Sequence, residues 1–157
     1  MSRWLGLSVL VFALDQISKW WAQGVLEPYR PEPVMPFFNL MLAYNKGAAF
    51  NFLADQGGWQ RWFFVALAVI VAAVLVAWLR RLEAGQWRTA AGLALIIGGA
   101  LGNVFDRLIH VHVIDFLDFY YGDWHWPAFN LADSAITLGV IFLLLESLFH
   151  KDAQNPE

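Results

Sequence analysis

A run of 18 uncharged residues, from Trp62 to Leu79, restricts the fold of this chain more than any other feature of its sequence. A helix rises about 1.5 Å per residue, so the run is long enough to cross the roughly 30 Å hydrocarbon core of a bilayer. The whole chain is also apolar, with 59% hydrophobic and 15% charged residues among 157. We expect an integral membrane protein of the mainly α class, with four transmembrane helices at about 4–21, 62–79, 89–105 and 134–149.

The charges between these spans predict an orientation. Residues 80–88 carry three Arg and one Glu, whereas residues 109–132 carry three Asp and neither Lys nor Arg. By the positive-inside rule, the Arg-rich loop and both termini lie in the cytoplasm. Segments 23–60 and 109–132 are then extracytoplasmic, and residues 1–157 form a single membrane-embedded domain.

The segment 23–60 is too polar to span a membrane, and its four prolines between residues 28 and 36 exclude a long helix there. The aromatic-rich stretch 37–53 favours short strands and a turn, so we expect a small extracytoplasmic β-sheet, or cradle, at the membrane surface. Within that stretch, Asn45-x-Gly47 is typical of a turn. The small residues around it would let a backbone approach a ligand closely.

Composition excludes several functions. The formal net charge is −3 and the ten Lys and Arg are scattered, which argues against a nucleic-acid partner. The absence of Cys excludes disulfides, thiolate nucleophiles and thiolate metal ligands. His110, His112 and His125 lie near several Asp residues, but no His-Glu-x-x-His helix is present. We therefore expect no metal and no cofactor, and histidines that are solvated at the interface.

Two groups of polar residues interrupt the predicted spans. Asp15 and Lys19 are four residues apart, so they share a helix face and can form an ion pair near the end of the first span. Asn103, Asp106 and Arg107 lie at i, i+3 and i+4 and share a face at the outer end of the third span. Both groups are compatible either with a membrane boundary or with a functional site.

Asp115 and Asp133 are a candidate catalytic pair. Asp115 stands in the apolar setting Val-Ile-Asp-Phe, and Asp133 precedes the fourth span, where it is a candidate N-cap. A carboxyl group in an apolar site tends to keep its proton, whereas one at a helix N-terminus is held ionised. An aspartic protease needs this asymmetry, although spacing alone does not favour this pair over Asp118 or Asp123.

Two other classes of function remain open at this point. Acidic residues in membrane helices also mark ion pathways, so a small proton-coupled transporter is an alternative. It predicts Asp residues spread through the depth of the bilayer. A membrane assembly module without catalysis is the other, and it would not require two acids in apolar settings.

The order of five sequence blocks resembles the motif series of the signal peptidase II family, the lipoprotein signal peptidases. The blocks are Asp15-Gln16-x-x-Lys19, Asn45-x-Gly47-Ala48-Ala49-Phe50, Gly98-Gly99-Ala100-x-Gly102-Asn103-x-x-Asp106-Arg107, Val113-Ile114-Asp115-Phe116 and Phe129-Asn130-x-Ala132-Asp133.

The resemblance implies a bacterial intramembrane aspartic endopeptidase with its active site at the extracytoplasmic face of the inner membrane. Such an enzyme removes the signal peptide from diacylglyceryl-modified prolipoproteins by cutting on the amino side of the lipidated Cys. The resemblance also implies contact with membrane lipids and binding of globomycin-type inhibitors. It places the catalytic pair at Asp115 and Asp133, the substrate-binding residues at Asn45, Gly47, Asn103, Arg107 and Asn130, and supporting residues at Asp15, Lys19 and Asp106.

Overall fold

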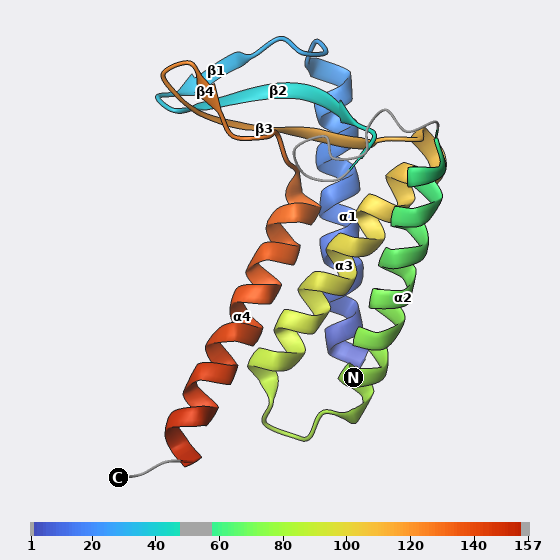
Figure 1. Ribbon diagram of the computed structural model, residues 1–157, viewed down its shortest axis with the longest axis vertical. Helices are drawn as coiled ribbons and strands as arrows, with labels where there is room; N and C mark the ends of the chain where they lie inside the picture. Colours follow the sequence, from blue (N-terminus) through green and yellow to red (C-terminus); the bar gives the residue numbers. More distant parts are fainter. Residues whose placement is uncertain (1, 48–57, 155–157) are drawn as a thin grey trace.

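Helices form one bundle in this protein, and a small sheet lies across one end of it (Figure 1). The computed structural model describes residues 2–47 and 58–154. The start of α1, the end of α4 and the loop between α2 and α3 lie at the end of the bundle opposite the sheet. In chain order the elements are α1 (Ser2–Val25), β1 (Glu32–Met35), β2 (Phe38–Asn45), α2 (Trp59–Arg81), α3 (Trp87–His110), β3 (Val113–Tyr121), β4 (Trp124–His125) and α4 (Leu131–Gln154).

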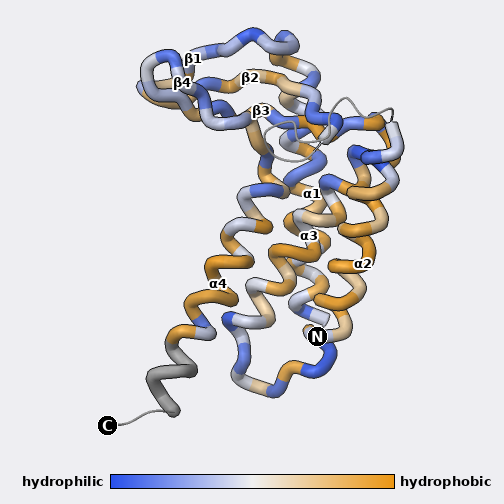
Figure 2. The backbone as a smooth tube through the Cα atoms, viewed as in Figure 1, coloured by the Kyte–Doolittle hydropathy of each residue, from blue (hydrophilic) through white to orange (hydrophobic). Residues whose placement is uncertain are grey.

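Apolar residues follow the helices, and polar residues gather at the sheet and at the α2–α3 loop (Figure 2). Among the described residues, three helices are long and apolar enough to cross a membrane: Trp59–Arg81, Trp87–His110 and Leu131–Leu148. All four helices contain the predicted spans but extend beyond them at both ends. Hydropathy locates the apolar part of a helix and not the polar turns that continue it.

The first helix, α1, differs from the other three because Asp15, Gln16 and Lys19 interrupt its apolar run. All three side chains are buried inside the bundle. The outward-facing residues of the same helix are apolar, and they include Leu14, Ile17 and Trp20–Trp21.

The central helix of the bundle is α3. In its apolar span 67% of the residues are buried, compared with 11% in the span of α2 and 17% in that of α4. Small residues make this position possible. A Cβ on Gly98 would lie 2.6 Å from the carbonyl oxygen of Ser8 in α1, and one on Gly102 would meet the carboxylate of Asp15. Gly98 and Gly102 of α3 therefore let neighbouring groups of α1 approach closely.

The sheet is antiparallel with strand order β1-β2-β3-β4. The sequence predicted strands at 37–53, where β2 lies. It predicted neither β1, in the proline-rich part of the same segment, nor β3 and β4, which come from residues 109–132. Val113–Phe116 are all buried, so the start of β3 lacks the alternation of buried and exposed residues that a one-sided strand shows. The pairing of Ala43 with Asp115 and of Asn45 with Val113 brings the two segments together over the ends of the helices.

Candidate active site

Strand β3 carries Asp115, whose exposed fraction is only 2%. Its carboxyl group accepts two side-chain hydrogen bonds. The Nδ2 atom of Asn130 donates to Oδ1 at 2.7 Å, and the Nδ2 atom of Asn45 donates to Oδ2 at 3.2 Å. Burial, and secondly the negative charge of Asp133, raise the pKa of Asp115 from 3.8 to about 7.

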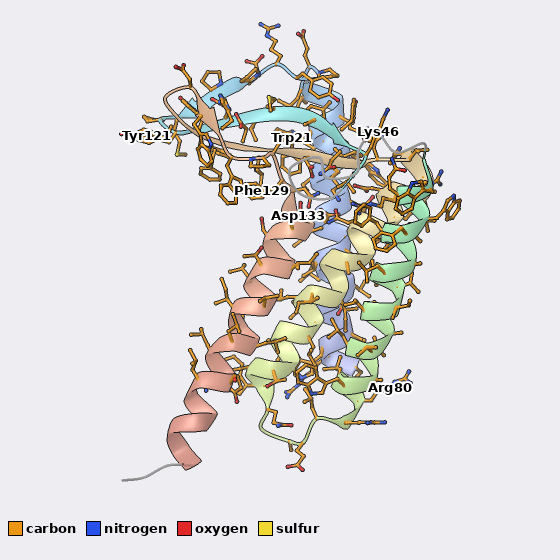
Figure 3. All side chains as sticks on the ribbon, in the orientation of Figure 1. Trp21, Lys46, Arg80, Tyr121, Phe129 and Asp133 are labelled. Carbon is orange, nitrogen blue, oxygen red and sulfur yellow. The ribbon has the colours of Figure 1, made fainter. Side chains whose placement is uncertain are left out.

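The first turn of α4 contains Asp133 (Figure 3). The prediction that Asp133 is the N-cap is wrong, because the helix begins at Leu131 and the capping side chain belongs to Asn130. Oδ1 of Asn130 accepts from the backbone N–H of Asp133 at 2.9 Å, and Oδ2 of Asp133 accepts from the backbone N–H of Asn130 at 3.2 Å. This reciprocal pair is a capping box that holds Asp133 in one orientation.

The amide of Asn130 therefore joins the two aspartates. Its oxygen faces the backbone of Asp133, and its nitrogen faces the carboxyl group of Asp115. The side chain is fully buried. A second amide completes the link, because Nδ2 of Asn103 donates to Oδ1 of Asp133 at 2.8 Å, while Oδ1 of Asn103 accepts from Asn130 at 3.1 Å.

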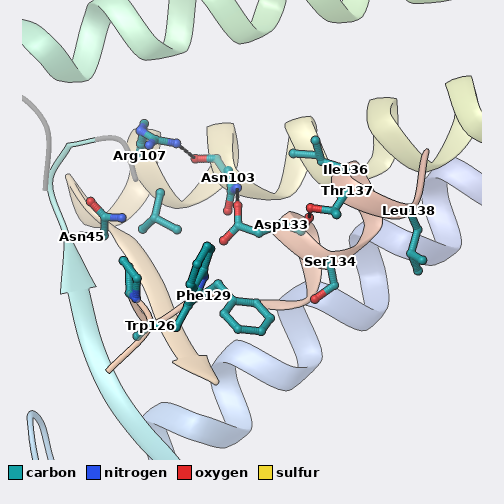
Figure 4. Close-up of a pocket in the computed structure, with 13 residues that line it drawn as sticks. Asn45, Asn103, Arg107, Trp126, Phe129, Asp133, Ser134, Ile136, Thr137 and Leu138 are labelled. Carbon is teal, nitrogen blue, oxygen red and sulfur yellow. Dashed lines mark hydrogen bonds between the residues drawn. The ribbon is translucent and has the colours of Figure 1, made fainter. Parts of the chain in front are cut away.

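A cavity of about 680 Å³ borders this arrangement (Figure 4). Asn103 and Asp133 face each other at its wall, and Trp126 and Phe129 form another side. Asp115 is buried behind this wall, but its hydrogen-bond donor Asn45 belongs to the wall. The full lining is Asn45, Asn103, Arg107, Val113, Trp126, Pro127, Ala128, Phe129, Asp133, Ser134, Ile136, Thr137 and Leu138.

Arg107 connects the cavity to the turn after β2. Its Nη2 donates to the carbonyl oxygen of Gly47 at 2.9 Å, and its guanidinium lies 5.2 Å from the ring centroid of Phe64. The backbone N–H of Gly47 donates to Oδ1 of Asn45 at 3.0 Å, which leaves the Nδ2 of Asn45 to face Asp115. The predicted turn thus orients Asn45. The rest of its motif, Ala48–Phe50, lies outside the described residues.

Behind the site, Asp15, Lys19 and Asp106 form a fully buried ionic cluster. The ammonium of Lys19 lies 2.8 Å from a carboxylate oxygen of each Asp. Oδ1 of Asp15 accepts from the backbone N–H of Ala132 at 2.9 Å, and Oδ2 of Asp106 accepts from that of Ile114 at 3.1 Å. The cluster therefore anchors both the start of α4 and the start of β3.

The other candidate acids lie elsewhere. Asp118 is fully buried in the sheet, where it accepts from Asn39 at 2.9 Å and contacts Nδ1 of His125 at 2.9 Å. Asp123 is exposed at the turn between β3 and β4. Neither belongs to the cavity wall. The His112 ring packs at a tilt against the ring of Tyr44. The described residues hold no group of three or more His, Cys, Asp or Glu that could bind a metal ion.

Hydrogen bonds thus bring all ten predicted site residues into one network. Sequence reasoning missed the strap 126–129 and the α4 residues Ile136 and Thr137, which line the cavity. The α4 residues carried a usable signal, because i+3 and i+4 from Asp133 lie on the same helix face. The strap 126–129 carried no such signal, because its position depends on backbone hydrogen bonds to Phe119 and Leu117 of β3.

Comparison with known proteins bears on the identity of this site. Residues 7–149 match the family model described as signal peptidase (SPase) II. The chain is similar to the lipoprotein signal peptidase of Pseudoalteromonas atlantica, with 52% identity over 98% of this chain and 93% of the relative. It is 56% identical to the lipoprotein signal peptidase of Aeromonas hydrophila, over 92% of this chain and 87% of the relative.

Two solved structures, both described as bacterial membrane enzymes, share the fold. One aligns with a TM-score of 0.88 and 26% identity over 100% of this chain and 94% of its own. The other has a TM-score of 0.80 and 28% identity over 94% of each chain. With a family match over nearly the whole chain and relatives above 50% identity, the chain belongs to the signal peptidase II family of aspartic peptidases, the lipoprotein signal peptidases.

Proposed function

We propose that Asp115 and Asp133 are the catalytic pair of this peptidase, and that it cuts diacylglyceryl-modified prolipoproteins on the amino side of the lipidated Cys. The observation that carries the proposal is the link between the two carboxyl groups through the buried amide of Asn130, beside a cavity bordered by Asp133. Asp118 and Asp123 lack such a link and lie away from the cavity wall.

The environments of the two aspartates assign their roles. The raised pKa of Asp115, about 7, lets a large share of its carboxyl groups keep their proton near neutral pH. Asp133 supplies the negative charge that contributes to this shift and accepts hydrogen bonds from Asn103 and from the backbone of Asn130. Asp133 then acts as general base and Asp115 as general acid.

In the first step, Asp133 takes a proton from water as the water oxygen attacks the scissile carbonyl carbon. Asp115 gives its proton to the carbonyl oxygen, so that a neutral tetrahedral gem-diol forms. When the C–N bond breaks, the leaving amine of the lipidated Cys receives the proton from Asp133, and Asp115 recovers a proton from the diol. The products are a signal peptide with a new carboxylate and a lipoprotein with a free amino terminus.

Substrate binding involves Asn45, Gly47, Asn103, Arg107 and Asn130 in this proposal. The contact of Asn45 with Oδ2 of Asp115 is, at 3.2 Å, the longer of the two hydrogen bonds to that carboxyl group. We expect the scissile carbonyl to replace Asn45 there, after which the freed amide and the guanidinium of Arg107 hold the peptide backbone. The apolar part of the cavity, with Ile136 and Leu138 of α4, is suited to acyl chains.

The same proposal includes the placement in the membrane. The charged residues of α1 face inward and its outer face is apolar, which supports α1 as a fourth span. The Arg-bearing α2–α3 loop then lies in the cytoplasm together with both termini, and the sheet and the aspartates lie at the extracytoplasmic face of the inner membrane. In this placement a lipid-bearing substrate reaches the aspartates laterally from the bilayer.

The test is cleavage of a diacylglyceryl-modified prolipoprotein by purified protein in detergent, with mass spectrometry of both products. We expect one cut, immediately before the lipidated Cys, that is unaffected by EDTA and blocked by globomycin. Unmodified prolipoprotein serves as the matched control and should not be cut. A cut at another bond would contradict the assigned specificity, and inhibition by EDTA would contradict the metal-free mechanism.

A further inference from the structure

Lys19 has one contact that its ion pairs do not require. Besides the carboxylates of Asp15 and Asp106, its Nζ donates to Oδ1 of Asn103 at 3.1 Å. An ammonium group has three N–H donors and no acceptor, so these three contacts use its full capacity. Lys19 thus connects the buried ionic cluster directly to an amide that contacts Asp133.

The chemistry of an ammonium decides which way the amide of Asn103 points. Because Lys19 can only donate, the atom of Asn103 that faces it has to be the oxygen. The same oxygen accepts from Nδ2 of Asn130, which is a second donor on that side. A flipped amide would place its N–H groups against two donors, so the nitrogen is left to face Oδ1 of Asp133 at 2.8 Å.

We propose that Lys19 is a positioning residue of the active site: its ammonium fixes the orientation of the Asn103 amide and thereby directs an N–H donor onto Asp133. The inference rests on the proposed role of Asp133 as a catalytic carboxylate. Lys19 does not line the cavity and has no exposed surface, so it acts through Asn103 and not on the substrate.

Gln16 provides the comparison that separates positioning from packing. It lies on the same helix, is 4% exposed, and donates to Asp106 at 2.9 Å, to Asp15 at 3.2 Å and to the carbonyl oxygen of Gly102 at 3.4 Å. It therefore belongs to the same cluster but makes no contact with Asn103. Loss of Gln16 disturbs the cluster, whereas loss of Lys19 disturbs the cluster and also removes one of the two donors that hold the amide oxygen of Asn103.

The experiment compares Lys19→Met with Gln16→Met, two substitutions to the same unbranched apolar residue. We would measure kcat and KM with the lipid-modified prolipoprotein, and the unfolding temperature by intrinsic fluorescence. For Lys19→Met we expect kcat to fall roughly 100-fold, because Asp133 loses a fixed donor, while KM changes less than about twofold. Gln16→Met should keep kcat within about threefold of wild type despite a lower unfolding temperature.

A double substitution tests the route of the effect. If Lys19 acts through Asn103, then Lys19→Met should not lower kcat further in an Asn103→Ala background. If Lys19→Met does not fold, Asp15→Asn/Lys19→Met replaces it, with Asp15→Asn as its reference. In the double variant, as in the wild type, the cluster contains one more carboxylate than it contains cations.

Three results would overturn the inference. They are equal kcat values for Lys19→Met and Gln16→Met at equal loss of thermal stability, a change in KM alone, and an undiminished effect of Lys19→Met in the Asn103→Ala background. The proposed function fails separately, since in that case the wild-type protein would not cut the substrate or Asp133→Asn would still cut it.

Discussion

Two groups of carboxylates lie side by side in this protein, and their surroundings differ. Asp15 and Asp106 share the ammonium of Lys19, have no exposed surface, and accept backbone hydrogen bonds from α4 and β3. Asp115 and Asp133 have side-chain amides as hydrogen-bond partners. Asp133 borders the cavity, and Asp115 is buried behind the cavity wall. A carboxylate neutralised by a cation and closed off from solvent serves structure, whereas two carboxyl groups without a bound cation, beside a cavity, are suited to proton transfer.

The largest effect should come from the pair beside the cavity. We expect Asp133→Asn or Asp115→Asn to lower kcat by roughly 10⁴-fold or more with the fold retained, because each removes one of two groups that act as a unit. For the same reason, the double variant should be no less active than either single variant. Single-turnover cleavage assays and fluorescence-monitored unfolding would check both points, and activity that survives in either single variant would break the proposed pairing.

The buried ionic cluster should respond in stability. Asp106→Ala removes one of the two carboxylate partners of the fully buried Lys19 ammonium. It also leaves the backbone N–H of Ile114 without its acceptor. We expect a loss of about 3–5 kcal/mol in the free energy of unfolding, the usual cost of breaking a buried ion pair. Urea unfolding in detergent would measure it. A change below about 1 kcal/mol would mean that the cluster contributes little to the anchoring of β3.

Asp115 should make the stability of the protein depend on pH. Since its pKa rises from 3.8 to about 7 on folding, the folded protein holds this proton more tightly than the unfolded chain. Asp115 therefore costs no stability below pH 4 and lowers the free energy of unfolding as the pH rises from about 4 to about 7. Asp115→Asn lacks this loss, so we expect its stability relative to wild type to be higher at pH 8 than at pH 4, by about 2–4 kcal/mol.

Unfolding curves of both proteins at the two pH values would test this expectation. A constant difference between Asp115→Asn and wild type at pH 4 and pH 8 would contradict the raised pKa.

The smallest effect is expected at Asp118. This carboxylate is buried like that of Asp115, but its oxygens contact the side chains of Asn39 and His125. It also lies away from the cavity wall. Asp118→Asn should cost about 1–2 kcal/mol in stability, the cost of a weakened buried hydrogen bond, and keep kcat within about threefold. Cleavage assays beside Asp115→Asn would measure the contrast. A large loss of kcat would return Asp118 to the candidate acids.

The sequence predicted which residues belong to the network better than it predicted the contacts between them. The i, i+4 spacing of Asp15 and Lys19 predicted their ion pair, which the structure contains. It did not predict Asp106 as the second partner, because that residue lies on another helix. Likewise, an Asp before an apolar run indicated the start of α4, but the capping residue is Asn130, three positions earlier.

Local patterns of this chain by themselves determined the helices of the bundle, the strand β2 and the blocks that carry the family resemblance. These features depend on periodicity, turn chemistry and hydropathy, all of which act over a few residues. Tertiary structure alone decided which carboxyl groups meet. Asp15 reaches the backbone of Ala132 across 117 positions of the chain, and Asn45 reaches Asp115 across 70. Contacts of this kind depend on how β2, β3 and α4 dock on α3, and no local pattern encodes that docking.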